Sequence, residues 1–497
     1  MSVATHLQRI KEKIPSSYTL LRIALPVVLG YMLAKVIINP YHRMVELLVG
    51  FFIAAAAILI KPSRAIAAFI VIFLFPAHLS IGTSNNVFIL ILVSTWIAQQ
   101  VLAGERISAR TPLDLPIIAL SMAYLLSLSN VPHGYYGVNF RTLSVYFTSV
   151  AIYYMVVNLT PDTAALRRLI FAGAIGAAMM VTIGMIEIFI PGKELLPYFF
   201  VSSHAPIDVG VVRAGSGFRN ASVLSQYCLF YVFLGVFLLI TEKLRFARFL
   251  LMSLLITALT VFISTAMRGA VLAGAGGLVF LMWRSRRVFD TRKVLIGIIT
   301  CVVVFVVLHQ ILSSSGFVPN VWERFAELEQ KRGSHVSRGE VMIEVFRRSL
   351  EHPFVGHGPL ITLPHGFVAT GSGNPHCQYA LYFYTLGLLG LGSFLWLLAS
   401  LFRVSSQALR AGGQNRFLLG LMVILQTFLV VFVLHETVDD YSSSFNYPLF
   451  IWYFFGLIVA TRNVILREAG LAGKPGDLSG YKQRKRGVRP NRLEPAH

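Results

Sequence analysis

Fourteen apolar segments divide this chain, and they constrain its fold more than any other feature of the sequence. Most are close to the roughly 20 residues that an α-helix needs to cross a bilayer. Charged residues make up only 13% of the 497 residues, whereas a soluble domain carries about 25%. The sequence therefore predicts an all-α, polytopic membrane protein with about 14 transmembrane helices. The segments are 18–38, 44–60, 65–80, 86–103, 115–129, 142–159, 167–190, 223–241, 247–266, 269–283, 294–312, 378–402, 416–435 and 447–462.

Lysine and arginine are unevenly distributed between the connections of these segments. With a cytoplasmic N-terminus, the cytoplasmic parts of the chain hold 29 of the 43 basic residues. Cytoplasmic connections are enriched in Lys and Arg, so we expect both termini inside and the alternate connections outside. This distribution accounts for the formal net charge of +21, and we expect no nucleic-acid partner. Residues 1–17 are polar and basic and precede no cleavage pattern, so we expect no cleavable signal peptide.

The predicted topology divides the chain into five parts. These are a cytoplasmic N-terminal segment (1–17), transmembrane helices 1–11 (18–312), a large outer loop (313–377), transmembrane helices 12–14 (378–462) and a basic cytoplasmic tail (463–497). The run Lys-Gln-Arg-Lys-Arg in the tail indicates contact with anionic lipid headgroups.

The outer loop 313–377 contains one predicted amphipathic helix. Ser337 and Glu340 have the spacing of a capping box. Five following residues share one helical face, which would lie on the outer leaflet or roof a cavity. They are Met342, Val345, Phe346, Ser349 and Leu350. Arg338, at the start of this helix, is a secondary candidate for the functional site.

His376 lies where the outer loop meets the next apolar segment. Asn374 can cap that helix and Pro375 fits its first position, which would place His376 in the first turn. A helix N-terminus favours negative charge and disfavours an imidazolium ion. We therefore expect a neutral His376, as a general base must be.

Arg268 lies between two apolar segments, in FISTAMRGAVLAGAGG, at the predicted outer face. These two segments could form a broken helix pair with a very tight outer turn. An arginine among small residues at a membrane boundary is costly unless it has a partner, so we interpret Arg268 as a packed functional residue. A snorkelling arginine at a helix end is the alternative.

Two further arginines, Arg213 and Arg219, bracket a glycine-containing outer loop in RAGSGFRNASVLSQY. Arginine grips phosphate oxygens with two parallel hydrogen bonds. The loop therefore suits a phosphate group, although a turn-rich loop with solvated charges would have the same composition.

Two outer histidines, His352 and His357, belong to the segment HPFVGHGP. Its prolines and glycines predict a helix end followed by a turn, so chain geometry explains the segment. A metal site formed with His365 is the alternative, but the spacing matches no zinc pattern.

An acidic outer connection precedes the last apolar segment. His435-Glu436 and Asp439-Asp440 could bind a cation or a sugar, but such a group is more often solvated. Glu187, near the outer end of another apolar segment, is a buried acid without an assigned partner.

Several catalytic motifs are missing from the sequence. It contains no D-x-D, no P-loop and no G-x-S-x-G elbow. We therefore expect chemistry outside the cytoplasm, without ATP or a nucleotide sugar. A lipid-linked diphosphate sugar fits as a donor, because its leaving group needs positive charge and its acceptor hydroxyl needs a base.

Three stretches carry a resemblance to a known family. They are RAGSGFRNASVLSQY, STAMRGAVLAG, and EHPFVGHGP followed by NPHCQYALYFYTLGLLGLG. Together they resemble the O-antigen ligase and polymerase superfamily of bacterial envelopes, over roughly residues 20–460. Cys377 stands where the family usually has Asn, and Met267 where it usually has Ser.

The resemblance implies a GT-C-type fold and transfer of an undecaprenyl-diphosphate-linked oligosaccharide to an acceptor glycan or lipid A–core. It implies an inverting reaction without metal or other cofactor. His376 would be the base, and Arg268 and Arg213 would clamp the diphosphate, with Arg219 as a further candidate. The location implied is the bacterial inner membrane with a periplasmic site, with polysaccharide assembly proteins as possible partners.

The residues do not separate a ligase from a polymerase, because both share the donor, the leaving group and the base. A membrane transporter of a small anion or glycan is the alternative from another functional class. Transport sites usually lie near mid-membrane, whereas the candidate residues here cluster at the outer face.

Overall fold

A computed structural model describes most of the chain and is nearly all helical. It covers residues 62–72, 78–79, 82–103, 110–190, 207–208, 211–212, 214–218, 220–241, 244–286, 291–318, 320, 322, 338–359, 376–412, 415–441 and 447–471. The α-helices are α4 (Pro62–Ile72), α5 (Ser84–Ala103), α6 (Asp114–Ser127), α7 (Tyr136–Asn158), α8 (Thr163–Phe189), α9 (Ala221–Thr241), α10 (Arg245–Thr265), α11 (Arg268–Ser285), α12 (Thr291–Ser314), α14 (Arg338–Ser349), α15 (Gln378–Ala411), α16 (Arg416–His435) and α17 (Tyr447–Glu468).

Short elements join some of these helices. The strand β1 (His78–Leu79) pairs antiparallel with β2 (Gly82–Thr83), and β3 (Ile207–Asp208) pairs antiparallel with β4 (Val211–Val212). The 3-10 turns are η1 (Leu128–Asn130), η2 (His133–Tyr135) and η3 (Ser216–Phe218).

The apolar segments predicted from the sequence correspond closely to these helices. Segments 18–38 and 44–60 lie outside the described residues, and each of the others overlaps a helix. Among the described helices, eight are long and apolar enough to cross a membrane. The prediction for 65–80 was too long, because α4 ends at Ile72 and His78 begins a strand. The total of 14 helices and the outer position of loop 313–377 stay predictions.

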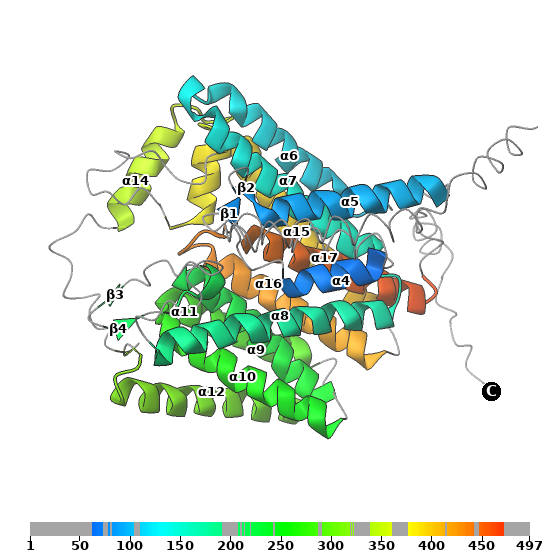
Figure 1. Ribbon diagram of the computed structural model, residues 1–497, viewed down its shortest axis with the longest axis vertical. Coiled ribbons are helices and arrows are strands. Elements are labelled where there is room, and N and C mark those ends of the chain that lie inside the picture. Colours follow the sequence, from blue (N-terminus) through cyan, green and yellow to red (C-terminus); the bar gives the residue numbers. More distant parts are fainter. Residues whose placement is uncertain are drawn as a thin grey trace, which may run out of the picture.

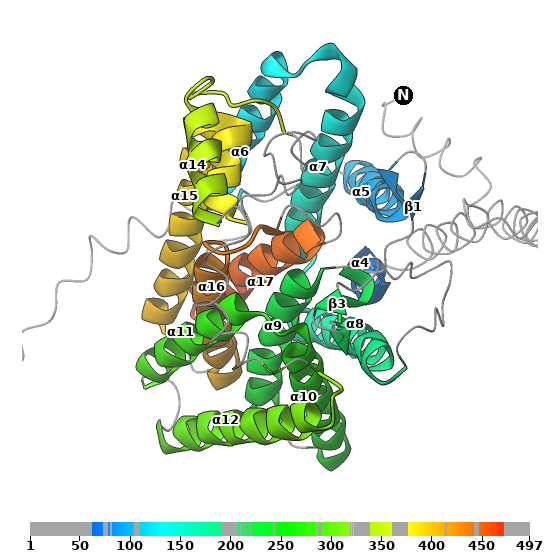
Figure 2. The ribbon, with the colours of Figure 1, turned by 90° about the vertical axis from the view of Figure 1, so that its left-hand side faces the viewer.

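The bundle is packed around α17. In the most apolar stretch of α17, 94% of the residues are buried, and the helix contacts α7, α15 and α16. Figure 2 shows α17 in the middle of the bundle and α12 at its edge. In the most apolar stretch of α12, only 11% of the residues are buried. Since α12 is apolar all round, its exposed surface is the kind that faces lipid.

Helix α15 is broken near its start, at Gly387. This residue has φ 66° and ψ −165°, a conformation essentially restricted to glycine. The backbone amides of Leu388 and Leu389 donate instead to the carbonyls of Pro353 and Phe354, at 2.7 and 3.2 Å. The turn formed by residues 353–358 therefore supplies the hydrogen bonds that the break removes from α15.

The same turn also binds the other side of the break. The backbone amides of His357 and Gly358 donate to the carbonyls of Tyr384 and Thr385, both at 3.0 Å. At Gly356 a β-carbon would lie 2.3 Å from the carbonyl carbon of Thr385. The segments HPFVGHGP and TLGLLGLG, which carry part of the family resemblance, are thus one hydrogen-bonded unit.

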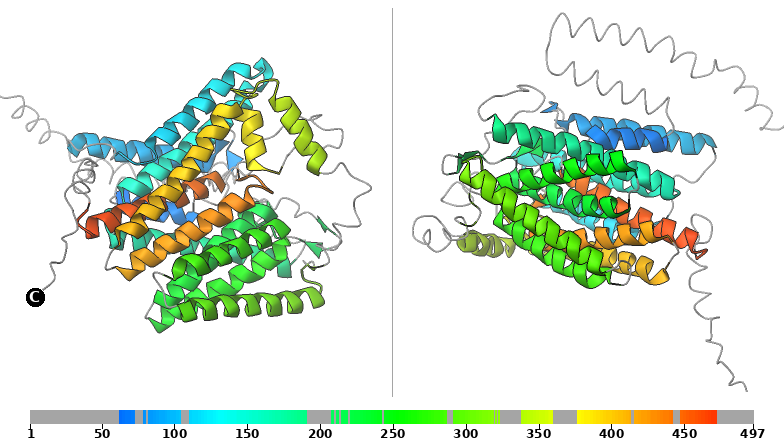
Figure 3. Two further views of the ribbon diagram at one scale, coloured as in Figure 1. Left: turned by 180° about the vertical axis from the view of Figure 1, so that it is seen from behind. Right: turned by 90° about the horizontal axis from the view of Figure 1, so that it is seen from below.

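Helix α14 confirms the predicted amphipathic helix, and two of the five residues on its predicted face, Val345 and Ser349, are buried in the protein. Val341, Val345 and Ser349 are buried, the two valines against Tyr384 of α15. Phe346 and Leu350, on the same predicted face, are 58% and 57% exposed. Figures 1 and 3 show α14 beside the start of α15, running across the direction of the long helices. Ser337 lies outside the described residues.

Candidate functional site

His376 lies immediately before α15 rather than in its first turn. Its backbone has φ 49°, and the N-cap is Cys377, whose side chain makes no capping hydrogen bond. Asn374 and Pro375 lie outside the described residues. The backbone amide of Gln378 donates to the carbonyls of both Glu436 and Asp439, at 3.0 Å each. The first backbone amide of α15 is therefore already hydrogen-bonded within the protein.

A carboxylate faces the His376 ring. Nδ1 of His376 lies 3.5 Å from Oδ1 of Asp439, with the two side chains 38% and 6% exposed. Burial alone would raise the pKa of Asp439, but the hydrogen bond from His376 and the nearby His435 outweigh it and hold this pKa below its ordinary value. Asp439 is thus a charged, buried partner for a half-exposed imidazole.

The acidic connection between α16 and α17 is buried, which corrects the expectation that it is solvated. His435, Glu436, Asp439 and Asp440 are each at most 4% exposed. Glu436 accepts a hydrogen bond from the side chain of Gln226 at 3.1 Å and from the backbone amide of Tyr441 at 3.0 Å. Burial raises the pKa of Glu436, and the adjacent His435 offsets this only in part.

This connection is tied to neighbouring helices. The Ser222 hydroxyl, at the start of α9, lies 3.4 Å from Nε2 of His435. The hydroxyl of Tyr379 in α15 donates to the carbonyl of Val433 at 2.9 Å. The hydroxyls of Tyr382 and Tyr441 are 2.5 Å apart. Residues 435–441 are therefore held by α9 and α15, and their Asp439 contacts His376.

Arg268 begins α11 after the tight turn that the sequence suggested. Helix α10 ends at Thr265, and Ala266 adopts a left-handed conformation with φ 49°. Arg268 is half-buried, beside the buried Ser264 and Thr265. At the next residue, Gly269, a β-carbon would lie 2.5 Å from a methyl group of Val438. The start of α11 thus packs on the same connection that holds Asp439.

Arg213 and Arg219, which bracket the glycine-containing loop, both lie outside the described residues. The part between them is anchored by Glu187 of α8. Oε2 of Glu187 accepts hydrogen bonds from the backbone amides of Gly215 and Ser216, at 3.0 and 2.8 Å. Glu187, which lacked a partner in the sequence interpretation, fixes the middle of this loop.

His352 and His357 belong to a turn after α14, as predicted, and this turn forms the hydrogen bonds with α15 at its break. Nε2 of His357 lies 2.9 Å from the carbonyl oxygen of Arg348, and its ring stacks on Tyr384 with 4.5 Å between centroids. Burial lowers the pKa of His357. The His352 ring packs edge-on against His357. Arg338 starts α14, and His365 lies outside the described residues.

One group of described residues could hold a metal ion. His376, Asp439 and Asp440 each offer a ligand atom within 4.8 Å of the others. Two carboxylates and an imidazole suit a divalent cation. The same residues could equally work as a base with its orienting carboxylate.

Sequence reasoning missed Asp439 as the partner of His376. The available signal was the density of four titratable residues, His435, Glu436, Asp439 and Asp440, between two strongly apolar segments. Charges buried in a protein are usually paired, so such a cluster beside a membrane span indicates a built polar site.

A comparison with known protein families bears on this arrangement. The O-antigen ligase family matches residues 252–395. This segment contains α11, α12 and α14, most of α10 and the first part of α15, and thus both Arg268 and His376. No curated protein matches the chain significantly. The apolar helices and this match together describe a membrane protein of ligase or polymerase type. The part of the chain that holds Arg268 and His376 is thus similar to the O-antigen ligase family.

Proposed function

We propose that the protein is a periplasmic-face glycosyltransferase. It moves an undecaprenyl-diphosphate-linked oligosaccharide onto an acceptor glycan, as an O-antigen ligase or as a polymerase of O-antigen or exopolysaccharide. The observation that carries this proposal is the 3.5 Å contact between His376 and Asp439, on the connection against which the start of α11, with Arg268, also packs.

His376 acts as the general base in this proposal. Asp439 accepts from Nδ1–H and fixes the ring, which leaves Nε2 for the acceptor hydroxyl. When the proton moves to Nε2, the carboxylate stabilises the imidazolium, as the aspartate of a Ser-His-Asp triad does. The low pKa of Asp439 keeps it charged for this task.

The transfer is a single displacement with inversion. The acceptor oxygen gives its proton to His376 and forms a bond to the anomeric carbon, while the bond from that carbon to the diphosphate oxygen breaks. The diphosphate leaves with the electron pair and gains negative charge. Arg268, with Arg213 and Arg219, stabilises that charge through paired N–H donors.

No metal ion is needed for these steps, since the arginines supply the positive charge at the leaving group. In this proposal Nδ1 of His376 carries the proton that is donated to Asp439, and a nitrogen that carries a proton does not bind a metal ion. We therefore propose a metal-independent reaction at this site.

Reconstitution in liposomes tests the proposal. The purified protein receives an undecaprenyl-diphosphate oligosaccharide, with and without lipid A–core, and the glycans are separated on a gel. A ladder from donor alone identifies a polymerase, and a single shift that needs lipid A–core identifies a ligase.

Matched variants connect the activity to the site. His376→Ala should abolish transfer, whereas His133→Ala, which changes an exposed histidine in η2, should not. Full activity in His376→Ala would refute the base assignment. Wild-type protein that carries glycan across the liposome membrane but forms no new linkage would instead establish a transporter.

A further inference from the structure

A cavity opens between α5, α6 and α7, away from the His376 site. Its volume is about 510 Å³, within the range of about 300–1,000 Å³ that is typical of small-molecule sites. Figure 1 shows these three helices on the side of the bundle opposite to α12. Nine residues line the cavity, and two of them, Arg110 and Asp114, are charged. A molecule in this cavity therefore meets both signs of charge.

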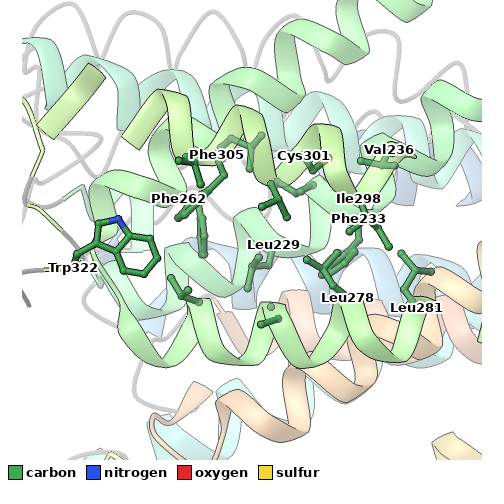
Figure 4. A pocket seen from close by; sticks show the side chains of 18 residues that line it. Leu229, Phe233, Val236, Phe262, Leu278, Leu281, Ile298, Cys301, Phe305 and Trp322 are labelled. Carbon is green, nitrogen blue, oxygen red and sulfur yellow. The ribbon is translucent and has the colours of Figure 1, made fainter. Parts of the chain in front are cut away.

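The charged lining distinguishes this cavity from the one shown in Figure 4. The cavity in Figure 4 lies between α9, α10, α11 and α12, and its lining is hydrocarbon apart from the thiol of Cys301 and the indole N–H of Trp322. Hydrocarbon side chains require no polar partner from a ligand. An arginine and an aspartate on one cavity do require such partners, because a charge withdrawn from water is costly unless it is paired.

Asp114 is oriented by three hydrogen-bond donors. Its Oδ1 accepts from the hydroxyls of Thr111 and Tyr154, the latter at 3.0 Å, and its Oδ2 accepts from the backbone amide of Thr111 at 2.9 Å. The hydroxyl of Tyr153 donates to Oγ1 of Thr111 at 2.9 Å, which connects the start of α6 to α7. A carboxylate has about four acceptor positions, so Oδ2 keeps one position for a donor in the cavity.

Arg110 lines the same cavity but does not pair with Asp114. It is exposed, and these two described residues form no ion pair with each other, although opposite charges in the membrane usually pair. The guanidinium group of arginine is a planar fork that matches a phosphate group. The free position on Asp114 suits an ammonium group. A ligand that carries both groups satisfies both residues at once.

The charged end of the cavity lies far from His376. Tyr154 is about one turn before the end of α7, and Thr163, just beyond that end, donates to Glu468 at the C-terminus of α17, at 2.7 Å. His376 instead contacts Asp439, which precedes the N-terminus of α17. The two places thus lie toward opposite ends of a 22-residue helix, which is about 33 Å long. In the predicted topology, the cavity lies on the cytoplasmic side.

We propose that this cavity binds phosphatidylethanolamine, with the lipid phosphate at Arg110 and the lipid ammonium group at Asp114. Its headgroup carries one negative and one positive charge, as these two residues require. Phosphatidylglycerol lacks the positive charge, and phosphatidylcholine lacks the N–H donors. The acyl chains leave the cavity past Ile118 and Phe147, which line it and are 56% and 39% exposed. This proposal does not depend on the proposed function.

The bound lipid connects helices that support the site. Helix α6 packs on α15, and α7 packs on α17, whereas α6 and α7 are linked at this end by the hydroxyls of Tyr153 and Tyr154. A ligand that binds only the folded protein stabilises it by mass action. Phosphatidylethanolamine should therefore raise the melting temperature of the protein in detergent.

Native mass spectrometry tests the selectivity for the headgroup. The full-length protein in detergent is titrated with phosphatidylethanolamine, phosphatidylcholine or phosphatidylglycerol that carry identical acyl chains. We expect phosphatidylethanolamine to bind about tenfold tighter than either other lipid, because a hydrogen bond to a charged group contributes at least that much. Equal binding of phosphatidylcholine would refute the contact with Asp114, and equal or tighter binding of phosphatidylglycerol would show a site for anionic lipids; each result overturns the proposal.

Matched variants locate the lipid. Asp114→Asn should reduce the affinity for phosphatidylethanolamine to that for phosphatidylcholine. Asp162→Asn is the control, because Asp162 also accepts a hydrogen bond near a helix start, from the backbone amide of Ala165, but lies outside the cavity lining. Arg110→Gln, at an exposed position where folding is not at risk, should weaken all three lipids by about tenfold, because each carries a phosphate. Undiminished binding in Arg110→Gln, or a preference for phosphatidylethanolamine that survives in a folded Asp114→Asn variant, would place the lipid elsewhere and overturn the proposal.

Discussion

The break in α15 gives the most quantitative prediction, through the substitution Gly387→Ala. An added β-carbon would lie 2.3 Å from the carbonyl carbon of Phe354 and 2.4 Å from its oxygen. Both are backbone atoms, so no side-chain rotation relieves the contact. The conformation itself, φ 66° and ψ −165°, costs a non-glycine residue about 1–3 kcal/mol.

Moving the backbone to relieve this contact also breaks hydrogen bonds. The amides of Leu388 and Leu389 would lose their acceptors at Pro353 and Phe354, at about 0.5–1.5 kcal/mol each. Together with the strain, we expect Gly387→Ala to destabilise the protein by about 2–6 kcal/mol. The turn 353–358 would separate from α15. The first part of α15, residues 378–386, would then lose the hydrogen bonds at its C-terminal end.

The assay is thermal unfolding of the purified protein in detergent, followed by intrinsic fluorescence. Gly392→Ala is the matched control, because it lies on the same helix with no atom within 4 Å of an added β-carbon. Alanine in a helix interior is favoured over glycine by about 0.5–1 kcal/mol, so this control should be slightly stabilised. Equal melting temperatures for the two variants would refute the reasoning about the break.

Four further predictions concern the site. Asp439→Asn should lower kcat by on the order of 10²-fold with little change in KM, because it leaves the base unoriented; a change in KM alone would contradict this. The pKa of Asp439 is lowered on folding, so its charge stabilises the folded protein above the unfolded pKa and this stability is lost as pH falls through the folded pKa. The stability difference between wild type and Asp439→Asn, measured by urea unfolding, should therefore shrink in acid. Arg268→Lys should lose about 10²-fold in transfer rate, since a point charge does not replace a planar fork; near-normal turnover would indicate a structural arginine. EDTA should leave the transfer rate unchanged, and a strong loss would assign His376, Asp439 and Asp440 to a cation.

The helices were predictable because hydrophobic length is a local property of the sequence. The segment 416–435 matches α16 residue for residue, and the tight turn before Arg268 follows from its small residues. The α15 break was not predicted, because an apolar run containing Gly387 is equally compatible with a continuous helix. Its cause is the turn 353–358, whose backbone bonds residues 27 to 35 positions later in the chain, and periodicity does not reveal such a partner.

The roles of the candidate site residues stay predictions, and the pairing of His376 with Asp439 was not predicted. His376 and Arg268 were identified from their position at the ends of apolar segments, yet the field expected at His376 was that of a helix N-terminus. The structure gives it a carboxylate instead, and Asp439 reaches it only because α15, α16 and α17 meet at one end of the bundle. Polar residues after an apolar segment are solvated or buried according to what packs over them, which is a tertiary property.

The two histidine-containing segments of this chain, 352–357 and 376–378, hold opposite ends of the first part of α15. The turn carrying His352 and His357 satisfies the backbone of a broken helix, and His357 is held by a carbonyl and an aromatic ring. His376 stands at the other end of the same helix segment, where the amide of Gln378 is held by Glu436 and Asp439. The segment 378–386 is therefore fixed at both ends by distant parts of the chain. Because a general base must meet its substrate within hydrogen-bond reach, this double attachment supports the proposed role of His376 as a base.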